Sequence, residues 1–190
     1  LSWSTNGLIN EYCNEADAIY EGKAVKLMPL EGAEKLVIEG ESFEAFNTSG
    51  GCATMCETYA DKVENLTYKT IRYPGHLNHM KFLFNDLHLK KNKDVLEKLF
   101  DKEVPRTKND VIIFFVKVIG LVDDVLQEKT YLRKIYGNEK FSAIQLTTAS
   151  GACSVLKMFL DGKLESKGFT KQESLSWKDF LDNKFGEVYS

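Results

Sequence analysis

The 190-residue chain lacks the features that mark several large classes of protein. Its four cysteines are too few and too scattered for a disulfide framework in a chain of this length. Its longest apolar stretch, Val111 to Val122, is interrupted by Lys117 and is too short to cross a bilayer. No two of its 13 glycines lie two positions apart, so it has no G-x-G-x-x-G turn to seat a dinucleotide pyrophosphate. These absences argue against a disulfide-rich secreted protein, a membrane protein and a complete Rossmann dehydrogenase.

The net charge and the N-terminal sequence further restrict the class of protein. A net charge of −3 gives no electrostatic footprint for nucleic acid. The N-terminus lacks a basic region followed by an apolar run and a cleavage site, so we expect a cytoplasmic protein. The chain begins with Leu1 rather than Met. Together with the missing glycine turn, this favours a fragment or a processed product over a complete dehydrogenase.

Two groups of potential metal or redox ligands occur, and both are weak. Cys52 and Cys56 lie four apart on an expected helix, which is compatible with a metal half-site, a redox pair or buried reduced thiols. The chain has three histidines, two of them His76 and His79, and no carboxylate or cysteine at matching spacing. We therefore expect no metal site, and buried thiols at the cysteine pair.

The order of apolar patterns predicts one α+β domain over residues 1–190, with a mixed, largely antiparallel sheet flanked by helices. Asp123 and Asp124 between two runs rich in β-branched and aromatic residues predict a long hairpin. Gly162 is expected to end a helix in the left-handed conformation, and Ser176 to begin the last one. The expected helices cover about 5–13, 53–61, 80–87, 95–100, 149–160 and 176–185, and the expected strands lie within 23–47, 67–73, 111–121 and 127–136.

The run from Thr70 to His76 carries the clearest candidate site. Pro74 and Gly75 fit the central positions of a type II turn between a strand and a helix, so Arg72 and His76 are expected at its mouth. An arginine fork matches a carboxylate, which makes a small acid such as an amino acid the natural ligand. His76, with an ordinary pKa near neutrality, is the candidate catalytic proton carrier. The alternatives are an arginine that satisfies loop carbonyls and a surface histidine that caps the helix.

Other segments supply further candidate substrate-binding residues. Thr48, Ser49 and Gly50 form a small turn before a helix, and free amides there attract anions. An ordinary hydroxyl-capped turn is the alternative. Three more residues complete the set: Trp3 and Ser4 at the first helix, and Thr147 before a later one. Core packing for Trp3 and helix capping for Thr147 are the alternatives.

Three segments carry a family resemblance: Ser2 to Tyr12, Phe46 to Gly51, and Thr70 to His76. With them the chain resembles the C-terminal domain of the saccharopine dehydrogenase and lysine dehydrogenase family over almost its whole length. The resemblance implies a fold like the second domain of glyceraldehyde-3-phosphate dehydrogenase, which holds much of the substrate site and makes a homodimer. It also implies a separate Rossmann domain, absent here, that binds NAD or NADP and towards which the last helix packs.

The resemblance assigns roles as well. Arg72 would bind a carboxylate of an amino-acid substrate, Trp3 would wall the nicotinamide, and His76 belongs to the same motif. The fungal saccharopine-forming enzymes have an arginine around Thr48 and Ser49, so a lysine-like amino acid is favoured over saccharopine. The implied parent enzyme is an oxidoreductase acting on a C–N bond, and this chain alone is expected to be inactive and to hold no cofactor. The alternative is a stand-alone ligand-binding or dimerisation module without catalysis.

Overall fold

A computed structural model describes residues 3–190, whose contacts divide into two compact units, Trp3–Pro105 and Arg106–Ser190. Each unit is described by itself. The prediction of one domain over 1–190 stays a prediction. The described strand pairs are all antiparallel and accompany helices, so the predicted α+β class is confirmed and no Rossmann fold occurs among these residues.

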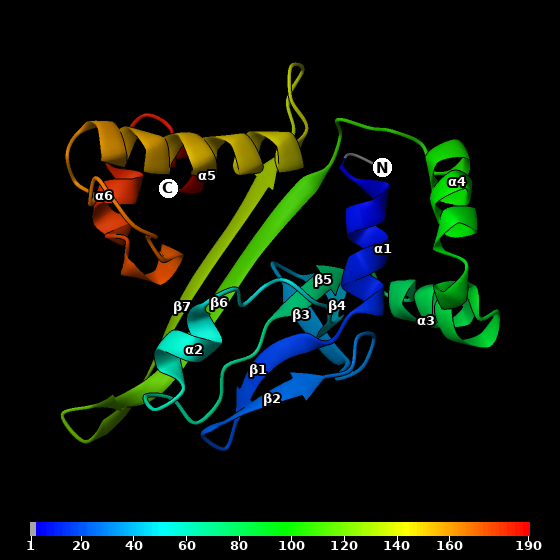
Figure 1. The fold of residues 1–190 in the computed structure, drawn as a ribbon, viewed down its shortest axis with the longest axis horizontal. Helices are drawn as coiled ribbons and strands as arrows, with labels where there is room; N and C mark the ends of the chain where they lie inside the picture. Colours follow the sequence, from blue (N-terminus) through cyan, green and yellow to red (C-terminus); the bar gives the residue numbers. More distant parts are fainter. Residues whose placement is uncertain (1–2) are drawn as a thin grey trace. The chain divides into compact units, whose positions relative to one another are not determined.

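The first unit begins with a helix and two small sheets, followed by a helical segment (Figure 1). Its helices are α1 (Thr5–Cys13), α2 (Met55–Tyr59), α3 (His76–Lys81) and α4 (Lys93–Glu103), with a π-helix η1 (Phe82–Asp86) and a 3₁₀ turn η2 (Leu89–Lys91). Its strands are β1 (Ala16–Tyr20), β2 (Lys23–Leu27), β3 (Glu34–Ile38), β4 (Glu41–Asn47) and β5 (Lys69–Arg72).

Strand β4 is the centre of the sheet that positions the site. The order in this sheet is β3-β4-β5, and the register places Glu44 opposite Arg72 and Phe46 opposite Thr70. Strands β1 and β2 form a separate hairpin, which an isolated bridge from Ile19 links to Leu66. The predicted single sheet is thus divided into small antiparallel sheets in this unit.

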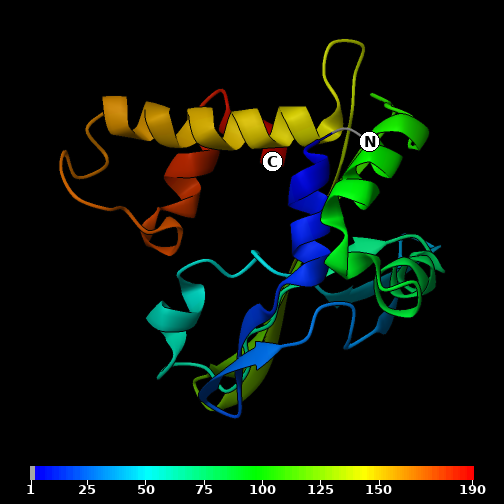
Figure 2. The same cartoon turned by 45° about the vertical axis from the view of Figure 1, so that its right-hand side comes forward.

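Helix α1 packs against α4, and both helices contribute to the main hydrophobic core of the first unit. The two helices lie side by side in Figures 1 and 2. Ser4 caps α1 by accepting a hydrogen bond from the Gly7 amide, and the Thr5 hydroxyl donates to Asp101 of α4. The buried cluster comprises Ile9, Tyr12, Cys13, Leu30, Phe46, Leu77, Phe84, Leu96 and Phe100. Because Ile9, Tyr12 and Cys13 recur at helical spacing, one face of α1 enters this core.

The second unit is built on a long hairpin of β6 (Val111–Val122) and β7 (Val125–Tyr136). Asp123 and Asp124 have φ of 51° and 60°, so both turn residues are left-handed, as a type I′ turn requires. The remaining elements are α5 (Ala143–Leu160), α6 (Trp177–Leu181) and the 3₁₀ turns η3 (Gln172–Ser174) and η4 (Gly186–Tyr189). The predicted hairpin and its turn are confirmed.

Helix α5 begins six residues before the expected position, because Ser142 and Gln145 form a capping box. It ends as predicted, with Gly162 just beyond it at φ +71°. Its buried residues are mostly small or polar: Ala143, Thr147, Ser150, Ser154 and Met158. Within the described part of the chain, α5 is the one helix whose 18-residue length and hydropathy suffice for a membrane span, and such a single helix is weak evidence of one.

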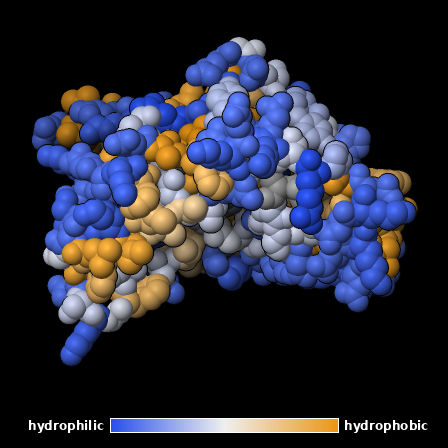
Figure 3. Space-filling view, turned by 90° about the horizontal axis from the view of Figure 1, so that it is seen from above, coloured by the Kyte–Doolittle hydropathy of each residue, from blue (hydrophilic) through white to orange (hydrophobic). Residues whose placement is uncertain are grey.

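Large apolar side chains remain exposed on the second unit. The strands of the hairpin expose Leu121 by 69% and Leu126 by 70%, two residues that face each other in the register. Leu156 and Leu160 of α5 are also exposed. The space-filling view shows hydrophobic patches among hydrophilic atoms on one face of the molecule (Figure 3).

Candidate functional site

The turn between β5 and α3 is fixed by a carboxylate from β4. Gly75 has φ +93° and ψ −13°, the conformation of the third residue of a type II turn, which a residue with a Cβ rarely adopts. The two carboxylate oxygens of Glu44 accept hydrogen bonds from the amides of Gly75 (3.0 Å) and Leu77 (2.6 Å). Glu44 therefore holds the turn and the first residues of α3 against the sheet.

Arg72 and His76 meet at the hydroxyl of Tyr12. Arg72 Nε donates to the Tyr12 hydroxyl at 3.2 Å, and Nη1 donates to the Ile71 carbonyl at 3.1 Å. The same hydroxyl lies 2.9 Å from His76 Nε2 in a hydrogen bond. The Tyr12 side chain of α1 is almost completely buried in the core of the first unit. The two residues predicted from the turn are thus brought together by a third residue 60 positions away in the sequence from Arg72.

The imidazole of His76 is enclosed by aromatic rings. The Phe46 ring stacks on it at a centroid distance of 6.2 Å, and the edge of Tyr73 contacts it at 5.0 Å. Burial, followed by the nearby Arg72 cation, lowers the pKa of His76 to about 4, while the Glu44 carboxylate opposes this shift. The expectation of a pKa near neutrality is therefore wrong, because desolvation disfavours the imidazolium. At neutral pH the ring is uncharged.

Two further acid groups lie in the field of Arg72. Burial raises the pKa of the Tyr12 hydroxyl, and the Arg72 charge and hydrogen bond oppose the shift. Burial also raises the pKa of the Glu11 carboxyl, and Arg72 again opposes it. The guanidinium therefore has a carboxylate neighbour at the end of α1, and a carboxylate-bearing ligand would share it with Glu11.

The loop that begins at Thr48 is tied to the same end of α1. The Thr48 hydroxyl is buried and hydrogen-bonds to that of Thr70 at 2.7 Å. The Ser49 amide donates to the Glu11 carbonyl at 3.1 Å, and Gly50 follows with φ +91°. The next helix begins only at Met55, so these residues are not its first turn. Thr48 and Ser49 thus connect structural elements, and their role in anion binding stays a prediction.

The remaining predicted residues lie elsewhere. Ser4 uses its hydroxyl as the cap of α1, and Trp3 lies against Gly7 in the first turn. Trp3 precedes α1, and the seven helical residues Thr5–Glu11 lie between it and Tyr12, about 10 Å along the axis. Thr147 belongs to the second unit, where its hydroxyl donates to the Ala143 carbonyl and its own carbonyl accepts from Tyr189.

The two cysteines on the loop and α2 are both buried. Burial, with the neighbouring Cys56 thiol, raises the pKa of Cys52 to about 12. Such a thiol stays protonated in the metal-free chain, and the burial of both side chains is what the buried-thiol alternative requires. Across residues 3–190, no group of three or more His, Cys, Asp and Glu side chains is arranged to hold a metal ion.

Comparison with known proteins assigns the chain to a family. The family model described as the saccharopine dehydrogenase C-terminal domain matches residues 1–187. The chain belongs to this family. Among solved structures, the chain is similar to an apo saccharopine dehydrogenase (L-Glu forming) from Saccharomyces cerevisiae, with a TM-score of 0.69 and 14% sequence identity. The match covers 89% of this chain and 55% of the yeast chain, so the chain spans about half the length of that structure.

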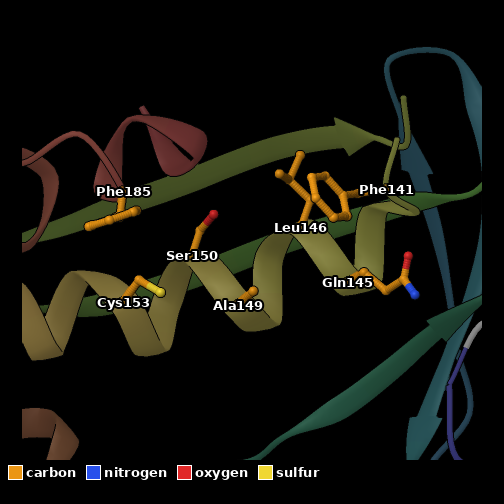
Figure 4. Close-up of a pocket in the computed structure, with 7 residues that line it drawn as sticks. All are labelled: Phe141, Gln145, Leu146, Ala149, Ser150, Cys153 and Phe185. Carbon is orange, nitrogen blue, oxygen red and sulfur yellow. The ribbon is translucent and has the colours of Figure 1, made fainter. Parts of the chain in front are cut away.

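This saccharopine dehydrogenase C-terminal domain also has a pocket of about 190 Å³ in its second unit (Figure 4). Ala149, Ser150 and Cys153 follow one another along α5, between Phe141 at one end and Phe185 at the other. The lining is almost entirely apolar and includes no charged side chain. A carboxylate would gain no ionic partner there, so the Arg72 cluster remains the candidate site of the domain.

Sequence reasoning missed three residues of this cluster. Tyr12, Glu11 and Glu44 were not among the candidates, although the first two lie in a segment that carried the family resemblance. The pairing of β4 with β5 would have placed Glu44 opposite Arg72, which is a signal that strand register can supply. No local sequence pattern predicts that Tyr12 of α1 lies against the turn.

Proposed function

We propose that the chain is the substrate-binding part of a nicotinamide-dependent oxidoreductase that acts on the C–N bond of an amino acid, and that Arg72 binds a carboxylate of the substrate. The observation that carries the proposal is the anchoring of the guanidinium by Nε and Nη1. Within residues 3–190, Nη2 makes no hydrogen bond. A guanidinium anchored in this way keeps Nη2 and the second hydrogen of Nη1 for a planar acceptor.

The family supports the reaction class, and the chain's own residues limit what they can hold. All described strand pairs are antiparallel, and the sequence has no G-x-G-x-x-G turn. These residues therefore do not fit a dinucleotide, and NAD or NADP would be bound by another part of the protein. His76 is uncharged at neutral pH and so would not donate a proton to the substrate as an imidazolium.

Replacement of Arg72 tests the carboxylate site. In the full-length protein, Arg72→Met should raise KM for the amino-acid substrate about 10- to 150-fold, because one charge-assisted hydrogen bond is worth about 1.5 to 3 kcal/mol. Arg133→Met is the matched control, since Arg133 also donates through Nη1 to the preceding carbonyl and lies in the other unit. Unchanged KM in the Arg72 variant would leave this residue a purely structural role.

The same assay separates the two functional classes. Oxidation of lysine-like amino acids, followed by the absorbance of the reduced nicotinamide, supports the enzyme. Binding of such an amino acid with Arg72-dependent affinity but without turnover supports the alternative, a ligand-binding module. We expect turnover in the full-length protein and none in this chain alone.

Dimerisation is the second part of the proposal. Two strands of 12 residues expose apolar side chains along the hairpin, and a two-stranded ribbon of this kind is marginal without a partner. We expect light scattering to show a homodimer that Leu121→Lys with Leu126→Lys converts to a monomer. Val37→Lys, at an exposed valine of β3, is the control. A dimer that survives the paired change contradicts the hairpin interface.

A further inference from the structure

The hydroxyl of Tyr12 occupies a position between a guanidinium and an imidazole. It lies 3.2 Å from Arg72 Nε and 2.9 Å from His76 Nε2. A guanidinium nitrogen only donates, so the Tyr12 oxygen accepts from Arg72. The hydroxyl has one proton of its own, and His76 Nε2 is its other partner. The direction of the second hydrogen bond therefore determines which nitrogen of His76 carries the ring proton.

One arrangement leaves fewer polar groups without a partner than the other. If Nε2 carried the proton, the Tyr12 oxygen would receive two donors, and its own proton would have no acceptor among the described residues. If Nε2 is the acceptor, Arg72 donates to Tyr12 and Tyr12 donates to His76 in one chain. The proton of the neutral ring then lies on Nδ1, which is buried and has no hydrogen-bond partner among residues 3–190 in either tautomer.

We propose that Tyr12 is a positioning residue of the carboxylate site, whose hydroxyl holds His76 in the neutral tautomer protonated on Nδ1 and fixes Arg72 through Nε. The assignment of the tautomer rests on geometry alone, and the effect on substrate rests on the proposed function. The low pKa of His76 agrees with a neutral ring. Helix α1 thereby controls both predicted site residues although it lies outside the turn.

The tautomer is tested without any ligand. Nitrogen-15 NMR of the imidazole in the full-length protein, assigned by loss of its signals in His76→Gln, should show the Nδ1-protonated ring at neutral pH. Tyr12→Phe removes the donor and should shift the ratio of the two neutral tautomers about 3- to 10-fold towards Nε2–H. Tyr73→Phe is the matched control, because its ring also contacts the imidazole. An Nε2-protonated ring in the unchanged protein, or no shift in Tyr12→Phe, overturns the proposal.

A second variant keeps the test decisive if Tyr12→Phe fails to fold. Arg72→Met removes the donor to Tyr12 but leaves the hydroxyl to donate to His76, so the Nδ1-protonated tautomer should persist. A change to the other tautomer in that variant overturns the proposal as well.

The kinetic test is separate from the NMR test. Tyr12→Phe should raise KM about 3- to 10-fold while kcat is unchanged, and Tyr73→Phe should change neither. Absence of any turnover would refute the proposed function and leave the tautomer result standing.

Discussion

Glu44 offers the sharpest test of how the site is assembled. Its carboxylate accepts two backbone amides, at 3.0 Å from Gly75 and 2.6 Å from Leu77. Charge-assisted hydrogen bonds are worth about 1.5 to 3 kcal/mol each, and Glu44→Gln keeps a single neutral acceptor worth about 1 kcal/mol. With the lower value for both bonds, the change should destabilise the turn by about 2 kcal/mol. We use the lower value because Glu44 is only partly buried.

Hydrogen exchange followed by mass spectrometry localises this loss. A change of about 2 kcal/mol corresponds to roughly 30-fold faster exchange in peptides that cover 70–81, where local opening limits the rate. Peptides from the second unit should exchange unchanged, and Glu64→Gln, at an exposed glutamate, should alter neither region. The loss of the Glu44 charge should also lower the pKa of His76 further, since this carboxylate now raises it. Equal exchange in Glu44→Gln and Glu64→Gln would refute the role of the carboxylate as the clamp of the turn.

Three further outcomes are expected. Asp123→Asn with Asp124→Gly should stabilise the second unit by about 0.5 to 1 kcal/mol, seen as a higher Tm, because both positions have positive φ; a lower Tm argues against the type I′ turn. Stability should fall as pH drops from about 6.5 to about 4, because unfolded His76 binds a proton that the folded ring excludes, and urea midpoints of His76→Gln should lack this component. In the native protein iodoacetamide should modify Cys153 before Cys52, whose pKa is about 12, and the reverse order of modified peptides contradicts this.

Much of the architecture could be predicted because local chemistry dictates it. The first helix, the type II turn at Gly75 and the hairpin turn follow from a cap, a glycine and two aspartates in sequence. Other elements have weaker signals. Strand β1 reads Ala-Asp-Ala-Ile-Tyr, and its two alanines have little strand preference, so it was missed. The early start of α5 had an available signal in the Ser142 and Gln145 capping box.

Only the part of the site that lies within one segment of the sequence could be predicted. Arg72 and His76 share a turn, so sequence places them together. Their chemistry depends on groups that tertiary packing delivers: Tyr12 from α1 supplies the hydroxyl, and Phe46 from β4 supplies the ring that desolvates His76. The pKa of His76 was misjudged for this reason, because burial by residues distant in sequence leaves no mark near the histidine itself.

The dependence of the site on α1 follows from where that helix is anchored. Its first turn is bound to α4 through Thr5 and Asp101, and Lys93 of α4 donates to Asn10 near its other end. Tyr12 and Glu11 follow immediately, so the position of the hydroxyl between Arg72 and His76 is set by helix packing rather than by the turn. A shift of α1 along α4 by one residue, about 1.5 Å, would break the chain of hydrogen bonds while leaving the turn and Glu44 in place. The orientation of the guanidinium is therefore a property of the whole first unit.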